Sequence, residues 1–229
     1  MELEAIIGLE THVQLKTKTK LFCACNNDSE KAEPNTNICP ICLAHPGTLP
    51  VINKEALEWA IRASLMLNCT INTISQMDRK NYFYPDLPKG YQISQFGFPV
   101  GHEGKVAFYS NGERKEINLE RLHVEEDAAK NIHDGNSTLI DYNRGGTPLC
   151  EIVTKPEFKT PEDAKAYMQT LRLTMRYLDI SDADMEKGHL RCDANISMRP
   201  KGETKLYPKT EVKNLNSFRS VEKALKHEI

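Results

Sequence analysis

The sequence predicts an α+β fold with a largely antiparallel sheet and flanking helices. Two segments, residues 5–15 and 190–198, alternate apolar and polar side chains with the period of a half-buried strand. Two others carry helix-start signals before amphipathic stretches, at Asn53 and at Thr160 followed by Pro161. Short strand-like runs separated by Asn, Gly and Asp lie between them, and no repeats or low-complexity tracts interrupt this order.

The first predicted strand has two faces of different chemistry. One carries Ile7, Leu9, Thr11, Val13 and Leu15, and the other carries Gly8, Glu10, His12 and Gln14. A helix is expected over about residues 54–67, capped by Asn53 and packing through Ala56, Leu57, Ala60, Ile61, Ser64 and Leu65. Residues 78–92 are dense in aromatics, charges and helix breakers, so they are expected to form a long ordered loop of the kind that carries function.

The second half of the chain follows the same logic. Strands are expected at about residues 105–109, 115–127, 139–142 and 148–154. Thr160, Pro161 and the acids after them start a helix that runs to about Leu178. A strand over 190–198 turns Arg191, Asp193, Asn195, Ser197 and Arg199 outward, and a last amphipathic helix starts at Asn216 or Ser217.

Composition favours a globular protein in a reducing compartment. The 229 residues are 39% hydrophobic and carry a net charge of −2, so any contact with RNA needs a local patch or another chain. The first residues form no signal peptide, from which we expect a cytoplasmic setting with Cys69, Cys150 and Cys192 as ordinary buried thiols. No stretch approaches the roughly twenty apolar residues of a membrane span.

Four cysteines form the strongest local motif. They stand as C-x-C and C-P-x-C, separated by thirteen mostly polar residues, and comprise Cys23, Cys25, Cys39 and Cys42. Four thiolates close the tetrahedral shell of Zn²⁺ and leave no position for substrate, so the spacing predicts a structural zinc site in a loop over residues 22–43. The alternative is that these are unrelated buried thiols.

Carboxylates and a histidine on strand faces suggest a second metal site. Glu10 and His12 lie two residues apart, with Cα atoms about 6 to 7 Å apart on one face. Glu125 lies on a second strand face and Glu151 lies in an apolar run, where an acid is expensive to bury alone. If the four side chains converge, their oxygen-rich set fits Mg²⁺ or Mn²⁺ better than zinc, while a plain solvated sheet face is the alternative.

A nucleotide site would have to be built without a P-loop or a G-x-G-x-x-G motif, because neither is present. Candidate phosphate-binding groups are Lys80, Lys89 and Arg144, with Gly145 and Gly146 offering backbone N–H groups. The segment that holds the glycines could equally be a hairpin turn. Asp193, with its neighbour Asn195, could add a metal ligand or a hydrogen bond, or could lie on an exposed strand face.

Several motifs together resemble one known family. They are GLETHVQL (8–15), PNTNICPIC (34–42), RKNYFYPDLPKGYQ (79–92), NRGGTPL (143–149) and EVKNLNS (211–217). These segments closely resemble the B-subunit family of the bacterial aspartyl/glutamyl-tRNA(Asn/Gln) amidotransferases. The resemblance is ordered along essentially the whole chain.

The resemblance implies a glutamine synthetase-like cradle domain and a carbon–nitrogen ligase. ATP would phosphorylate the side-chain carboxylate of misacylated Glu-tRNA(Gln) or Asp-tRNA(Asn), and ammonia would then displace the phosphate. The family's glutaminase A subunit supplies ammonia and a small C subunit completes a heterotrimer. By position, Glu10, His12, Glu125 and Glu151 resemble the family's metal ligands, and the four cysteines resemble its zinc site.

Family members continue beyond residue 229 with a helical domain and a tail domain that grip tRNA. The chain, residues 1–229, is therefore expected to be a cradle domain incomplete at its C-terminus, with weak tRNA affinity and no activity by itself. Two other functions stay open at this stage. One is a noncatalytic zinc-stabilised module that docks the glutaminase subunit, and the other is an unrelated metal-dependent phosphohydrolase.

Overall fold

The computed structural model describes residues 2–229, which form three helices and twelve strands. In chain order these are β1 (Leu3–Gln14), α1 (Lys54–Met66), β2 (Thr70–Ile71), β3 (Asp78–Asn81), β4 (Tyr91–Ser94), β5 (Gly101–His102), β6 (Lys105–Ser110), β7 (Glu113–Glu126), β8 (Lys130–Asp134), β9 (Ser137–Asp141), β10 (Pro148–Thr154), α2 (Pro161–Tyr177), β11 (Leu190–Pro200), β12 (Thr210–Leu215) and α3 (Phe218–Glu228). The α+β prediction is confirmed. Among the helices of residues 2–229, none combines the length and the apolar character needed to cross a membrane.

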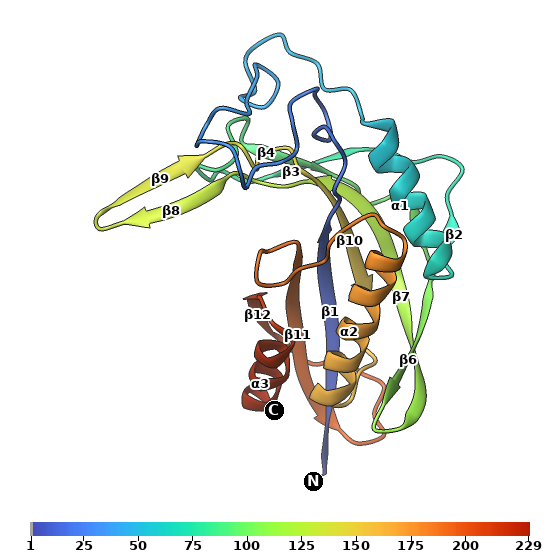
Figure 1. Cartoon of the computed structure of the whole chain (residues 1–229). Helices are drawn as coiled ribbons and strands as arrows, with labels where there is room; N and C mark the ends of the chain where they lie inside the picture. Colours follow the sequence, from blue (N-terminus) through green and yellow to red (C-terminus); the bar gives the residue numbers. More distant parts are fainter. Residues whose placement is uncertain (1) are drawn as a thin grey trace.

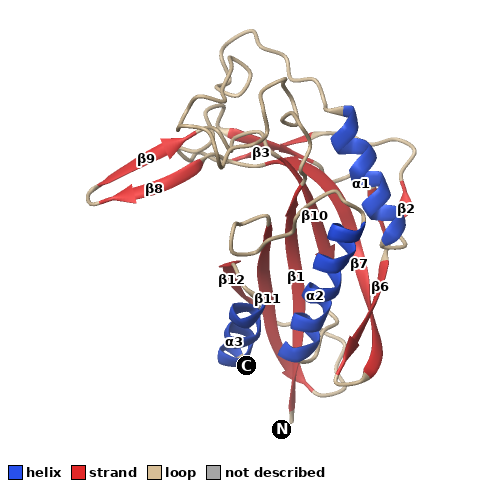
Figure 2. Cartoon of the chain, in the orientation of Figure 1, coloured by secondary structure: helices blue, strands red, loops and turns tan. Residues whose placement is uncertain are grey.

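A single antiparallel sheet organises the fold. Its strand order is β12-β11-β1-β10-β7-β5-β2, with β6 paired to β7, and every pairing in it is antiparallel. The longest strands, β1, β7 and β11, run through its middle, and α2 and α3 lie against the sheet (Figure 1). Two separate hairpins, β3-β4 and β8-β9, lie outside this sheet, and the second extends away from it as an arm (Figure 2). The likeness to glutamine synthetase remains a prediction.

The apolar face of β1 forms the centre of the core, as its alternation predicts. Ile7, Leu9, Thr11, Val13 and Leu15 are essentially inaccessible to solvent. The Thr11 hydroxyl donates to the Met168 sulfur of α2 at 3.4 Å, which shows that this face looks toward α2. Because burying one large apolar side chain contributes about 1.5–3 kcal/mol, this row accounts for much of the pairing of sheet and helix.

The helix starts predicted at Asn53 and Thr160 are confirmed, and of the two predicted starts of the last helix, Asn216 and Ser217, the structure has Ser217. The Asn53 side chain accepts from the N–H groups of Glu55 and Ala56, Thr160 accepts from Asp163, and Ser217 accepts from Ser220. One detail of α1 differs from the prediction. Ala63 is buried and Leu65 is exposed. The helix approaches β5 closely at Ser64, where a Cβ on Gly101 would come within 2.8 Å of the hydroxyl.

The prediction of one long loop over residues 78–92 is wrong at both ends of that segment. Residues 78–81 and 91–94 pair as the β3-β4 hairpin, with Lys80 opposite Gln92, and only residues 82–90 connect them. No strand was predicted from the sequence at β8 or at β12. Strands this polar and this exposed lack the apolar alternation by which a half-buried strand is identified.

Candidate functional site

Antiparallel pairing lines up polar residues across the face of the sheet that points away from α2, and Ser94 of β4 covers part of this face by donating to Glu125 Oε2 at 3.0 Å. His12 of β1 lies opposite Arg191 of β11 on one side and opposite Glu151 of β10 on the other. Glu151 in turn lies opposite His123 of β7, and Glu125 follows two residues later on the same face. Residues more than one hundred positions apart thereby form one row.

The side chains of this row converge on one point. His12 Nε2 lies 3.3 Å from Glu125 Oε1 and 3.5 Å from Glu151 Oε2. His123 Nε2 lies 3.0 Å from the same Glu151 oxygen and 3.7 Å from Glu125 Oε2. One donor atom from each of His12, Glu125 and Glu151 lies within 4.8 Å of the other two, which is the spacing of ligands that share a cation. Two carboxylates and one imidazole form a donor set that suits a hard divalent ion such as Mg²⁺ or Mn²⁺.

Burial and neighbouring charges shift the pKa values of the three side chains that meet at this point. Burial alone lowers the pKa of His12, but hydrogen bonds to Glu125 and Glu151 outweigh it and raise that pKa to about 10. Burial raises the pKa of Glu125, but its bonds to His12 and His123 lower it to about 2. The pKa of Glu151 is lowered in the same way. Two buried carboxylates thus hold their negative charge, which a divalent cation is able to neutralise in place of protons.

Glu10, the fourth predicted ligand, lies on the same face but outside the group of three. Its Oε1 accepts a hydrogen bond from Asn195 Nδ2 at 3.0 Å, and Asp193 is its cross-strand neighbour. Asp193 itself accepts from the Asn214 N–H. We call His12, Glu125 and Glu151 the metal-type group. Glu10 and Asp193 therefore lie beside this group on its β11 side, and their roles as ligand and as cofactor contact remain predictions.

The predicted phosphate-binding groups lie in different places. Lys89 pairs with the buried Glu126, whereas Lys80 is exposed on β3. Arg144 donates to the carbonyls of Ala128 and Ala129 at 2.9 and 2.7 Å. The neighbouring N–H groups are donated within the chain, from Gly145 to the Tyr142 carbonyl and from Gly146 to the Asp127 carbonyl, in a turn between β9 and β10. These two strands do not pair with each other, so the alternative of a hairpin turn is wrong. Contacts of these five residues with a nucleotide remain predictions.

Two residues of the site were not predicted as functional. His123 lies on the same face of β7 as Glu125, and Arg191 lies on the outward face predicted for its strand, but periodicity did not show which of these residues meet. Arg191 donates to Asp127 Oδ2 at 2.8 Å, while its Nε is buried with no hydrogen-bond partner in the described part of the chain. Arg191 thus brings a guanidinium charge to the edge of the group.

The four cysteines gather as their spacing predicts. Cys42 Sγ lies 3.4 Å from Cys23 Sγ and 3.7 Å from those of Cys25 and Cys39. Four thiolates bound to zinc at about 2.3 Å in a tetrahedron would be about 3.8 Å apart, so the cluster fits a tetrahedral ion. The hydrogen bond from Cys23, opposed by burial and helped by the charge of Lys20, lowers the pKa of Cys42 to about 4.

A fully buried lysine supports a negatively charged cluster. Lys20 is 0% exposed, and its Nζ donates to the carbonyls of Asn37 at 2.9 Å and Tyr142 at 3.2 Å. Its third neighbour is Cys42 Sγ at 3.6 Å. No carboxylate pairs with Lys20 within residues 2–229, and a buried ammonium without an anion is costly. Thiolates that retain net negative charge around a zinc ion would meet this requirement.

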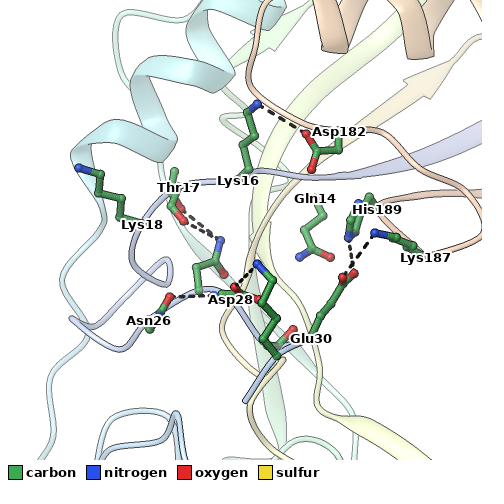
Figure 3. Close-up of a pocket in the computed structure, with 13 residues that line it drawn as sticks. Gln14, Lys16, Thr17, Lys18, Asn26, Asp28, Glu30, Asp182, Lys187 and His189 are labelled. Carbon is green, nitrogen blue, oxygen red and sulfur yellow. Dashed lines mark hydrogen bonds and ion pairs between the residues drawn. The ribbon is translucent and has the colours of Figure 1, made fainter.

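The cysteine loop, residues 22–43, has no strand or helix beyond one bridge between Thr19 and Asn26. It is held to the sheet by side chains instead. Asn27 Nδ2 donates to the carbonyl of Leu15 at 2.9 Å, and Glu30 contacts His189 Nε2 at 2.6 Å. Figure 3 shows the Glu30 carboxylate pointing toward both His189 and Lys187, among the residues that line a cavity. The loop is thus attached to the end of β1, the strand that carries His12.

A different cavity, of about 330 Å³, borders Glu10 at the opposite end of this face. Its lining is largely apolar with one aromatic residue, Tyr207, and its polar side chains include Glu10, Glu120, Thr154, Asn195, Ser197 and Lys209. Pockets of roughly 300–1,000 Å³ with this mixture commonly bind small molecules.

Comparison with known proteins identifies the family of the chain. A family model described as the GatB/GatE catalytic domain matches residues 5–229. The chain is 56% identical over its whole length to the B subunit of an aspartyl/glutamyl-tRNA(Asn/Gln) amidotransferase from Persephonella marina, and 55% identical over 99% of its length to the corresponding protein from Campylobacter jejuni. It spans 48% of each of these relatives, about half their length. The match covers every element that builds the two clusters, and the chain belongs to the GatB/GatE catalytic domain family.

Proposed function

We propose that this chain carries the phosphoryl-transfer and amide-forming centre of the B subunit of a tRNA-dependent amidotransferase. The substrate would be the side-chain carboxylate of Glu-tRNA(Gln), Asp-tRNA(Asn) or both. The observation that carries the proposal is the convergence of His12, Glu125 and Glu151 on one buried point. Family membership supports it, because relatives bearing that name match the whole chain.

The donor set fits the predicted Mg²⁺ or Mn²⁺, with His12, Glu125 and Glu151 as the residues that would hold it and Glu10 within the same strand face. A bound divalent cation would neutralise phosphate charge during phosphoryl transfer. His123 supports this set from outside, because its Nε2 contacts both glutamates and keeps their carboxylates oriented. The four cysteines fit zinc as a structural ion, because a closed tetrathiolate shell offers no position to a substrate.

ATP is proposed to occupy the cavity beside Glu10. Its apolar lining and Tyr207 suit a nucleobase, while Lys209 and Asn195 suit sugar and phosphate oxygens. The triphosphate would then extend along β1 from Glu10 toward His12. Arg191, whose Nε is unsatisfied, stands on the neighbouring strand where the transferred phosphate would arrive.

The chemistry follows from the poor reactivity of a carboxylate toward ammonia. A carboxylate oxygen of the aminoacyl side chain attacks the γ-phosphorus, the bond to the bridging oxygen breaks, and ADP leaves with that electron pair. Ammonia then attacks the carbonyl carbon of the acyl phosphate, loses a proton, and inorganic phosphate departs to leave the amide. The buried site favours both steps because it excludes the water that would hydrolyse the acyl phosphate.

Partners and setting are part of the same proposal. Ammonia would come from a glutaminase A subunit, a small C subunit would complete the heterotrimer, and tRNA would be held mainly by the half of the relatives that this chain does not span. The protein would act in the cytoplasm.

The test is Glu125→Gln in the assembled amidotransferase. The variant keeps the shape of the side chain but removes a carboxylate, so aminoacyl-tRNA-dependent ADP formation should fall at least about a hundredfold. Glu113→Gln, an exposed change on the same strand, serves as the matched control. Retained activity in Glu125→Gln would refute the site. If the wild-type chain assembles its complex but binds no ATP with Mn²⁺, the noncatalytic zinc-stabilised module becomes the better account.

A further inference from the structure

A cavity of about 380 Å³ lies at the other end of the strand face that carries the metal-type group. Its walls are the end of β1, residues 26–31 of the cysteine loop, and the segment before β11 (Figure 3). Gln14 belongs to its lining and follows His12 by two residues, so both side chains project from the same face of β1. We call this cavity the Gln14 pocket.

The Gln14 pocket is strongly polar and carries more lysines than acids. Three of its four lysines are paired with carboxylates, as in the contacts of Lys16 with Asp182 at 3.6 Å and of Lys187 with Glu30 at 3.8 Å. Lys18 is exposed and has no ion-pair partner in the described part of the chain. The Gln14 amide also makes no side-chain hydrogen bond there. One free cation and one free amide are thus available to a ligand with phosphate and hydroxyl or base groups.

The position of the pocket distinguishes it from the cavity beside Glu10. Glu10, His12 and Gln14 succeed one another on one face at intervals of about 6.6 Å, with one cavity at each end and the carboxylate group between them. Phosphoryl transfer requires the attacking and the leaving oxygen to lie roughly in line across the phosphorus. Donor and acceptor are therefore expected on opposite sides of His12.

We propose that the Gln14 pocket receives the 3′-terminal nucleoside of the aminoacylated RNA. The inference rests on the proposed function, since it assigns the acceptor side of the same reaction. A glutamyl side chain with its ester linkage is about as long as two backbone residues, roughly 7 Å, which matches the step from Gln14 to His12. A nucleoside in the pocket would thus direct its aminoacyl carboxylate at His12, Glu125 and Glu151.

This assignment gives the cysteine loop a function. Residues 26–31 supply one wall of the Gln14 pocket, and that wall is attached to the sheet through Asn27 and Glu30. An ion that organises residues 22–43 would shape the acceptor side and leave the cavity beside Glu10 unchanged, because no residue of the loop lines that cavity.

The decisive experiment maps the 3′ end chemically. Periodate oxidation of tRNA converts the terminal ribose to a dialdehyde, which condenses with a neighbouring lysine amine to an imine with loss of water. Cyanoborohydride then reduces the imine to a stable amine. In the assembled amidotransferase, peptide mapping should place the modification on Lys18 or Lys31 of the Gln14 pocket. Modification of Lys209, Lys80 or a partner subunit instead would overturn the proposal.

Kinetics provide a second measurement. Lys18→Ala should raise KM for aminoacyl-tRNA about fivefold to tenfold, with KM for ATP unchanged and a shallower dependence of affinity on salt. Lys223→Ala, an exposed lysine of α3, should change none of these. Unchanged KM for aminoacyl-tRNA in Lys18→Ala would count against the pocket. If instead the wild-type complex forms no ADP in response to aminoacyl-tRNA, the proposed function fails, whatever lysine the dialdehyde labels.

Discussion

Replacement of Lys20 by methionine tests whether the cysteine cluster carries negative charge. The substitution keeps the length of the buried stem but removes the ammonium, which lies 3.6 Å from Cys42 Sγ and donates to two carbonyls. A unit charge at that distance interacts by about 4.6 kcal/mol in an effective dielectric of about 20. This figure is an upper bound, because burying the ammonium has its own desolvation penalty.

The net effect should therefore be smaller and should appear in two parts. Loss of the two carbonyl contacts destabilises the protein by about 1 kcal/mol each, with or without zinc. Loss of the charge weakens zinc binding alone, by about 10- to 100-fold, as for other hydrogen-bond partners of metal ligands. Competition with a chromophoric chelator measures the affinity for zinc. Thermal unfolding measures the loss of the carbonyl contacts in the chelator-treated protein, and the losses of the contacts and of the charge together in the zinc-loaded protein.

Lys18→Met is the matched control, because Lys18 is exposed two residues earlier and makes no ion pair in the described residues. It should leave zinc affinity unchanged. If Lys20→Met binds zinc as tightly as the wild type, or loses equal stability in both forms, Lys20 serves only the two carbonyls. A role for its charge in stabilising the cluster would then be refuted.

Three further measurements test other parts of the structure. Tyr167→Phe removes a buried hydroxyl that has no hydrogen-bond partner among residues 2–229. The free energy of unfolding should therefore rise by about 1 kcal/mol and Tm by about 2–4 °C. A lower Tm would contradict this. His12 stays protonated below its pKa of about 10, so Mn²⁺ must displace a proton when it binds. Calorimetry should therefore show the affinity for Mn²⁺ rising about tenfold per pH unit between about pH 6 and 8. An affinity that does not change with pH would contradict this. Chelation of zinc should expose residues 22–43 to proteolysis before ATP binding is lost, and simultaneous loss of both would argue against separate roles.

Local signals in the sequence predicted the elements that position the site. Alternation identified both faces of β1, and capping residues identified all three helix starts, because each signal depends on neighbours within a few positions. The four-cysteine cluster was predictable for the same reason, since its members lie within twenty residues of one another. What alternation did not indicate were the exposed strands β8 and β12, whose polar residues carry no periodic apolar signal.

The carboxylate group depends on register, which no local pattern contains. His12 meets Glu151 and Glu125 only because β10 pairs with β1 and β7 in one particular alignment. A slip of one residue in β10 would turn Glu151 to the α2 side and bring an apolar neighbour to the site. The same alignment brings in His123, which differs from the predicted ligands in no local feature, and leaves Glu10 one step away beside Asn195. A strand face predicted from periodicity therefore identifies which residues can meet, and the pairing of distant strands decides which of them do.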